Sequence, residues 1–190
     1  MLLFAAIADE ETRHREVAID DSLLIGVAEG DKQAFTALYR EAGQSIYAYA
    51  LSILKNPAEA EDVLQDTFLK VRAAAPLYQP MGKPMAWILT ITRNLCLMKL
   101  RQKKSLSFFP LENLDEPAEL DQITDLEDRL VLRTALRVLG DDECQIIVLH
   151  AVTGWKHREI AQQLGMPLST VLSKYRRGLN KLRMELEGTL

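Results

Sequence analysis

Three side chains in the C-terminal half, Cys144, His150 and His157, are of types that serve nucleophilic catalysis or metal binding. Cys144 and His150 are six positions apart on one predicted helix, which turns them about 120° away from each other, and His157 lies beyond a turn. We therefore expect a core cysteine and two surface or helix-packing histidines. No carboxylate pair, glycine-rich phosphate loop or metal-ligand spacing accompanies them, so the sequence predicts no enzyme, no metal and no cofactor.

Polar side chains on the last predicted helix, residues 168–187, suit non-covalent contact with nucleic acid. Its apolar residues share one arc, and the opposite arc is basic and polar. Small hydroxyl residues near its start let the backbone approach a major groove, where they and Arg177 can reach base edges or phosphates. A short helix at 156–164 and a tight turn precede it, at helix-turn-helix spacing. The polar arc consists of Ser169, Thr170, Ser173, Arg176, Arg177, Asn180 and Lys181.

A third group lies on a helix predicted to begin at Asn56-Pro57, a cap followed by an N1 proline. Apolar residues spaced by three and four from Ala60 to Val71 predict one buried face. The opposite face carries two carboxylates, an amide and a leucine in one narrow arc, at Asp62, Gln65, Asp66 and Leu69. An exposed leucine among carboxylates favours a protein partner, although a solvated face with one stray leucine is the alternative interpretation.

The charge is distributed in three blocks, although the formal net charge is only -4. Lys83–Lys104 holds six basic residues and no acidic one, and Lys156–Arg183 holds seven basic residues and one acid. Between them, Ser105–Arg129 has eight acidic residues and one arginine. Two cationic blocks separated by an acidic spacer indicate two places that contact phosphate backbone. Solvated helix faces are the alternative for each block.

Helices must position all of these groups, because no run of alternating residues predicts a strand. We expect an all-α fold of two small domains joined by an acidic flexible linker. The first is a four-helix bundle with a proline-rich loop from Pro76 to Pro84, and the second contains the helix-turn-helix. The predicted parts are an N-terminal tail at 1–19, the bundle at 20–104, the linker at 105–124 and the second domain at 125–190.

The composition of the 190 residues, 48% hydrophobic and 26% charged, is that of an ordinary soluble protein. Two cysteines are too few for a disulfide framework. The apolar start, Met1–Ala8, lacks a basic flank, and no apolar stretch reaches the length of a membrane span. We therefore expect a cytoplasmic protein with no membrane insertion.

Three tracts together resemble the bacterial sigma-70 family, in its short extracytoplasmic-function (ECF) group. They are AEDVLQDTFLKV at 60–71, WILTITRNL at 87–95, and WKHREIAQQLG at 155–165 followed by LSTV at 168–171. The order and the spacing also match. The resemblance covers roughly residues 20–104, as regions 2.1 to 2.4, and 127–187, as regions 4.1 and 4.2.

The resemblance implies a non-enzymatic subunit that binds core RNA polymerase, directs it to promoters and helps to melt DNA. The implied partners are the β′ clamp helices and the β flap of the polymerase, promoter DNA and an anti-sigma factor. The arc Asp62, Gln65, Asp66 and Leu69 would dock on the clamp helices. The implied -10 contacts, where a flipped base is captured, are Tyr78, Gln79, Met81, Lys83, Arg93 and Asn94. The implied -35 contacts are Ser169, Thr170, Ser173, Lys174, Arg176, Arg177 and Lys181.

Two other classes of protein fit parts of this pattern. A dimeric helix-turn-helix repressor or activator would bind duplex DNA tightly without polymerase, at a palindromic site. A helical adaptor would touch no DNA, and both basic blocks would then be surface only.

Overall fold

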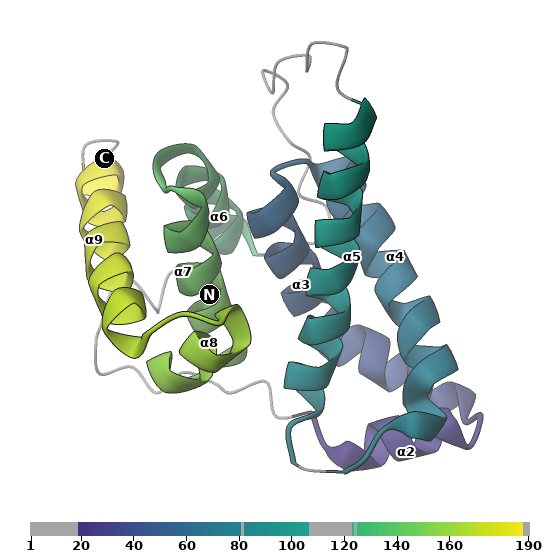
Figure 1. The fold of residues 1–190 in the computed structure, drawn as a ribbon. Coiled ribbons are helices and arrows are strands. Elements are labelled where there is room, and N and C mark those ends of the chain that lie inside the picture. The colour runs from purple at the N-terminus through teal and green to yellow at the C-terminus, as the bar shows by residue number, and fades with distance from the viewer. Residues whose placement is uncertain (1–18, 81, 107–122, 124, 188–190) are drawn as a thin grey trace. The chain divides into compact units, whose positions relative to one another are not determined.

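The computed structural model describes residues 19–80, 82–106, 123 and 125–187, and all regular structure within them is helical (Figure 1). The predicted all-α class is therefore confirmed. The described residues divide into two compact units, one made of helices α2 to α5 and the other of helices α6 to α9. The tail predicted at 1–19 and the linker predicted at 105–124 fall almost wholly outside the described residues.

Side-chain caps begin three helices of the first unit, α2, α3 and α4, and the cap at Asn56 is the one that the sequence predicts. The Asp31 carboxylate accepts a hydrogen bond from the Gln33 amide at 2.7 Å, and the Asn56 side chain accepts one from the Glu59 amide at 3.0 Å. The elements of this unit are α2 (Asp21–Ala28), α3 (Lys32–Leu54), α4 (Pro57–Ala74), the 3-10 turn η1 (Ala75–Leu77) and α5 (Pro84–Leu106).

Helix α3 lies at the centre of the first unit and packs against α2, α4 and α5. Its second half is buried almost all round, with Tyr47 and Tyr49 among the largest fully enclosed side chains. Helix α4 buries the arc that its spacing predicts, namely Ala60, Val63, Leu64, Thr67, Phe68 and Val71. This burial fixes which face of α4 points to solvent.

The second unit ends in a helix-turn-helix. Gly154 and Gly165 adopt left-handed φ angles of 69° and 68° and end α7 and α8, the second of them at the predicted tight turn. Helix α9 packs closely on α7, because a Cβ on Gly178 would lie 2.6 Å from Ile147 Cδ1. The helices are α6 (Leu126–Val138), α7 (Asp141–Thr153), α8 (His157–Leu164) and α9 (Leu168–Glu187).

The two histidines pack helices together, as expected. The rings of His150 and His157 stack with centroids 4.9 Å apart, and the Tyr175 ring meets both edge-on. His150 Nδ1 lies 2.7 Å from the Trp155 carbonyl oxygen, to which it donates.

Cys144 is buried. Within the described ranges, no three His, Cys, Asp or Glu side chains are grouped so as to hold a metal ion. No helix there is long and apolar enough to cross a membrane.

Candidate functional site

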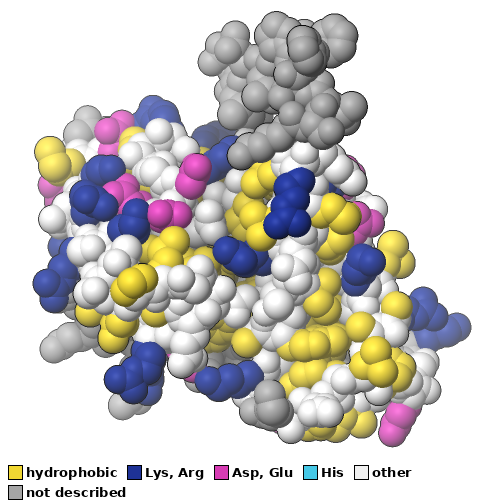
Figure 2. Space-filling view, viewed as in Figure 1, with side chains coloured by type: hydrophobic (Ala, Val, Ile, Leu, Met, Phe, Trp, Pro, Cys, Tyr) yellow, Lys and Arg dark blue, Asp and Glu magenta, His cyan; other side chains and the backbone are white. Residues whose placement is uncertain are grey.

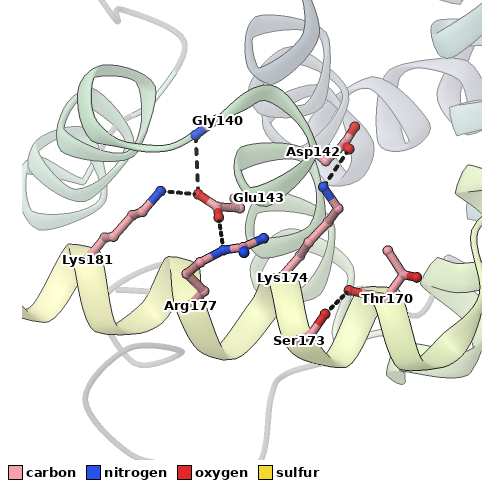
Figure 3. Close-up of polar contacts among 8 residues, drawn as sticks. All are labelled: Gly140, Asp142, Glu143, Thr170, Ser173, Lys174, Arg177 and Lys181. Atoms are coloured by element: carbon pink, nitrogen blue, oxygen red, sulfur yellow. Dashed lines mark hydrogen bonds and ion pairs between the residues drawn. The ribbon is translucent and has the colours of Figure 1, made fainter.

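The outward face of α9 carries hydroxyl and basic side chains, as its spacing predicts. Ser169, Ser173 and Arg176 are exposed, and each lies about one helical turn after the one before it. Thr170 is half-buried, and its carbonyl oxygen accepts a hydrogen bond from the Ser173 hydroxyl at 3.0 Å (Figure 3). This row offers short polar groups near the start of the helix and a cation further along.

A second row of cations on α9 is paired with acids on α7, as Figure 3 shows. Lys174 Nζ lies 2.9 Å from Asp142 Oδ2. Glu143 holds two cations, because Oε1 accepts from Arg177 Nε at 2.6 Å and Oε2 accepts from Lys181 Nζ at 2.7 Å. The Glu143 side chain is only 6% exposed, whereas that of Arg177 is 58% exposed. The basic arc of the sequence therefore has two rows with different surroundings.

Glu143 is anchored from its own helix as well. It stands in the first turn of α7, and Oε2 also accepts a hydrogen bond from the Gly140 amide at 3.3 Å. Burial alone would raise the pKa of this carboxyl, but the hydrogen bonds from Lys181, Arg177 and the Gly140 amide outweigh burial and lower it. Glu143 is therefore a charged acceptor at neutral pH. No local sequence pattern indicates this role, because the helix dipole alone explains acids in a first turn.

The loop between η1 and α5 is held by an acid that no local sequence pattern indicates. The Asp21 carboxylate, at the start of α2, accepts hydrogen bonds from the Tyr78 hydroxyl and from the Gly82 amide at 2.9 Å. The Tyr78 ring is half-buried and packs on Trp87 with centroids 5.1 Å apart. Predicted neighbours Gln79 and Lys83 are exposed. Met81 lies outside the described residues.

The two predicted DNA contacts on helix α5 differ in their exposure. Asn94 is exposed, but Arg93 is half-buried and lies near the hydroxyl of Tyr49. Burial raises the pKa of that hydroxyl, and the positive charge of Arg93 partly opposes the rise. Burial also raises the pKa of the Cys96 thiol to about 12, so this thiol stays protonated.

The four residues predicted to meet a protein partner all lie on the exposed face of α4. We call this set, Asp62, Gln65, Asp66 and Leu69, the α4 ridge. The Leu69 side chain is 63% exposed. At one end of the ridge, Asp62 Oδ2 forms an ion pair with Lys99 Nζ at 2.7 Å. Nearby, Glu59 Oε1 forms one with Lys103 Nζ, also at 2.7 Å. The C-terminal end of α5 is thus tied to the beginning of α4.

The space-filling view shows how charge is arranged over these helices (Figure 2). Lys and Arg side chains are spread over the C-terminal half of α5, and on α7 and α9 acidic side chains lie among basic ones. Of the cations on α5, Lys99 and Lys103 are paired with acids of α4, and Arg101 is exposed. The mixed charges on α7 and α9 match the pairing of α9 cations with Asp142 and Glu143.

Comparison with known proteins gives consistent matches for both units. Residues 38–106 match the family model of sigma-70 region 2, and residues 129–182 match that of sigma-70 region 4. The chain is 29% identical over 170 residues to the ECF RNA polymerase sigma factor SigK of Mycobacterium sp. (strain KMS), covering 86% of this chain and 88% of that protein. It is 30% identical over 164 residues to the RNA polymerase sigma factor CarQ of Myxococcus xanthus, covering 85% of this chain and 94% of that protein.

A solved structure shares the fold. It is the sigma factor RpoE of Bartonella quintana, in complex with the anti-sigma factor NepR, with a TM-score of 0.62 and 24% sequence identity. The match covers 82% of this chain and 98% of that one.

Proposed function

The chain belongs to the sigma-70 family, and from this premise we propose which of its surfaces carry out promoter recognition. It is an ECF sigma factor, a non-catalytic initiation factor that binds RNA polymerase and directs it to promoters. We assign residues 20–104 to polymerase binding and -10 recognition, 105–124 to a linker, and 125–190 to -35 recognition. We also assign the protein to the cytoplasm, where the polymerase is.

The α4 ridge is the proposed contact with the β′ clamp helices of the polymerase. Its support is physical: Leu69 is 63% exposed, and it is flanked by exposed acids. Burial of a leucine against a partner contributes about 1.5–3 kcal/mol, and the carboxylates add charge complementarity with a basic partner. The second unit would meet the β flap.

The loop that carries Tyr78 is the proposed -10 site. An aromatic ring beside a cationic block is an adequate platform for an unpaired base, because stacking and phosphate attraction offset the few kcal/mol lost per unstacked base. Gln79, Met81 and Lys83 would line the same loop. Arg93 and Asn94 would contact the single strand from α5.

Helix α9 is the proposed reader of the -35 element as duplex. The observation that carries the proposal is the exposed row of Ser169, Ser173 and Arg176 on the second helix of a helix-turn-helix. Thr170, Lys174, Arg177 and Lys181 complete the proposed contacts. An anti-sigma factor is a further proposed partner, by likeness to the RpoE structure, which is a complex with one.

One experiment tests the whole assignment. Purified protein is combined with core RNA polymerase, and the 5′ ends of transcripts made from genomic DNA are sequenced. We expect starts preceded by a shared -10 motif and a shared -35 motif. No comigration with core enzyme, or no gain in selectivity over core enzyme alone, would overturn the proposal.

Two observations would favour the alternative classes instead. Tight duplex binding by the isolated protein at physiological salt, at a palindromic site, would favour a dimeric repressor or activator. Unchanged promoter use after both Arg176 and Arg177 are replaced by alanine would favour an adaptor that does not read DNA.

A further inference from the structure

We infer that Glu143 is a positioning residue that orients Arg177 for the -35 element, an inference that rests on the proposed function of α9. Glu143 does not face the DNA-reading surface itself, since its side chain is 6% exposed. It lies behind Arg177, on the helix against which α9 packs.

The atom that Arg177 uses for this contact decides what remains for DNA. Its Nε donates to Glu143 Oε1 at 2.6 Å. A guanidinium has five N–H donors, of which only one is on Nε. The four donors on the terminal nitrogens form the fork that recognises phosphate or guanine in a bidentate manner. The contact with Glu143 therefore fixes the orientation of Arg177 from behind. The Arg177 side chain is 58% exposed, so this fork stays accessible.

Lys181 contacts the same carboxylate as Arg177, but through a different kind of nitrogen. Its ion pair uses Nζ, the one nitrogen of the side chain, at 2.7 Å from Glu143 Oε2. The Lys181 ammonium keeps two further N–H donors for a phosphate, but it is a point charge and not a planar fork. Glu143 thus acts on its two partners unequally, because only the arginine has a planar group whose orientation the contact can fix.

Three features fix Glu143 in place. The Gly140 amide donates to Oε2 at 3.3 Å, at the start of α7. Gly178 lets α9 approach α7, since a Cβ there would lie 3.4 Å from Glu143 Cβ and 2.6 Å from Ile147 Cδ1. The neighbours of Glu143 on α7, Cys144 and Ile146, are fully buried. A support of this kind lowers the entropy that Arg177 loses when it binds DNA.

The test measures -35 discrimination by reconstituted holoenzyme. The promoter is one mapped by the transcript experiment, and the readout is the ratio of open-complex formation on that promoter to formation on the same promoter with a scrambled -35 element. We expect Arg177→Ala to lower this ratio by about tenfold, as for loss of a bidentate base contact. Glu143→Ala should lower it by about threefold, because the fork is still present but no longer ordered.

A double-mutant cycle separates positioning from general stability. If Glu143 acts through Arg177, then Glu143→Ala has no further effect on the ratio once Arg177 is alanine. Glu143→Gln should recover part of the ratio, because the amide oxygen still accepts from Nε. Asp141→Ala is the matched control, since it removes one charge from the exposed first residue of the same helix and should leave the ratio unchanged.

The outcomes distinguish the inference from the function on which it rests. If Arg177→Ala leaves the ratio unchanged, Arg177 does not read a base of the -35 element, and the inference fails with that assignment. If Arg177→Ala lowers the ratio but Glu143→Ala does not, or does so equally in both backgrounds, only the inference is overturned. Helical content and core binding of each variant are measured alongside, and the ratio is independent of the fraction of active protein.

Discussion

The Tyr78 hydroxyl donates a hydrogen bond to the Asp21 carboxylate, across 57 positions of sequence. The other oxygen of the same carboxylate accepts from the Gly82 amide at 2.9 Å. One side chain at the start of α2 therefore holds two points of the loop proposed to capture a -10 base. The loop is braced by an element distant in sequence.

Replacing Asp21 by alanine should weaken promoter opening without weakening core binding. The substitution removes both hydrogen bonds, each worth about 1 kcal/mol, which corresponds to a decrease in open complex of about fivefold to thirtyfold. The measurement is permanganate reactivity of thymines at the -10 element. Glu29→Ala, at the exposed C-terminal end of the same helix, is the control and should open promoters normally. A normal open complex with Asp21→Ala would remove Asp21 from loop positioning.

Replacing Leu69 by alanine should weaken binding to core polymerase by about tenfold to a hundredfold, because burial of a leucine side chain contributes about 1.5–3 kcal/mol. The dissociation constant of the holoenzyme, measured by fluorescence titration, reports this directly. Leu77→Ala is a matched control, because Leu77 is 82% exposed in the same unit but lies off the α4 ridge. Equal weakening by both substitutions would argue against the ridge as the docking surface.

Replacing Gly178 by alanine should destabilise the second unit by about 1–2 kcal/mol, even though alanine favours helix by about 1 kcal/mol. The new methyl group would lie 2.6 Å from Ile147 Cδ1, in a site where Ile147 is 1% exposed. Urea denaturation gives the free energy of unfolding.

The same contact supplies its own control. Ile147→Val deletes the Cδ1 atom that clashes, so adding Gly178→Ala to that variant should cost nothing or increase stability. If Gly178→Ala alone is stabilising, α9 does not approach α7 as closely as described.

Local sequence signals were enough to predict the elements. The Asn56 cap and the spacing from Ala60 to Val71 fix both the start of α4 and its buried face, because each depends only on near neighbours. The same spacing placed the α4 ridge in solvent. The apolar arc of α9 is buried at Val171, Tyr175, Leu179 and Leu182, whereas Leu168, the first residue of the helix, is 37% exposed.

Contacts between distant segments could not be predicted in the same way. Periodicity placed Arg177 on a polar arc but said nothing of Glu143, which is 34 positions away and meets it only because α9 packs on α7. Asp21 was missed for the same reason, since its partners lie 57 and 61 positions away. Which cations face solvent and which are paired is decided by tertiary packing.

The stability of the second unit should depend on pH through Glu143. Its pKa is lowered below the ordinary value of 4.5 in the folded protein, so its pairs with Lys181 and Arg177 stabilise the fold above that pH. The contribution is lost as the pH falls through the folded pKa, because the carboxyl then takes up a proton. Glu143→Gln should therefore be less stable than the parent at pH 7, and the difference should shrink as the pH falls below about 4.5.

Trp155 fluorescence can follow this unit alone. The chain has two tryptophans, so a Trp87→Phe background leaves Trp155, buried in the second unit, as the single reporter. The free energy of unfolding in urea is measured across the acid range for the parent and for Glu143→Gln in that background. Taking the difference between the two cancels the titration of all other carboxylates. A difference that is independent of pH would mean that Glu143 has the same pKa folded and unfolded, and that its two ion pairs do not stabilise the fold.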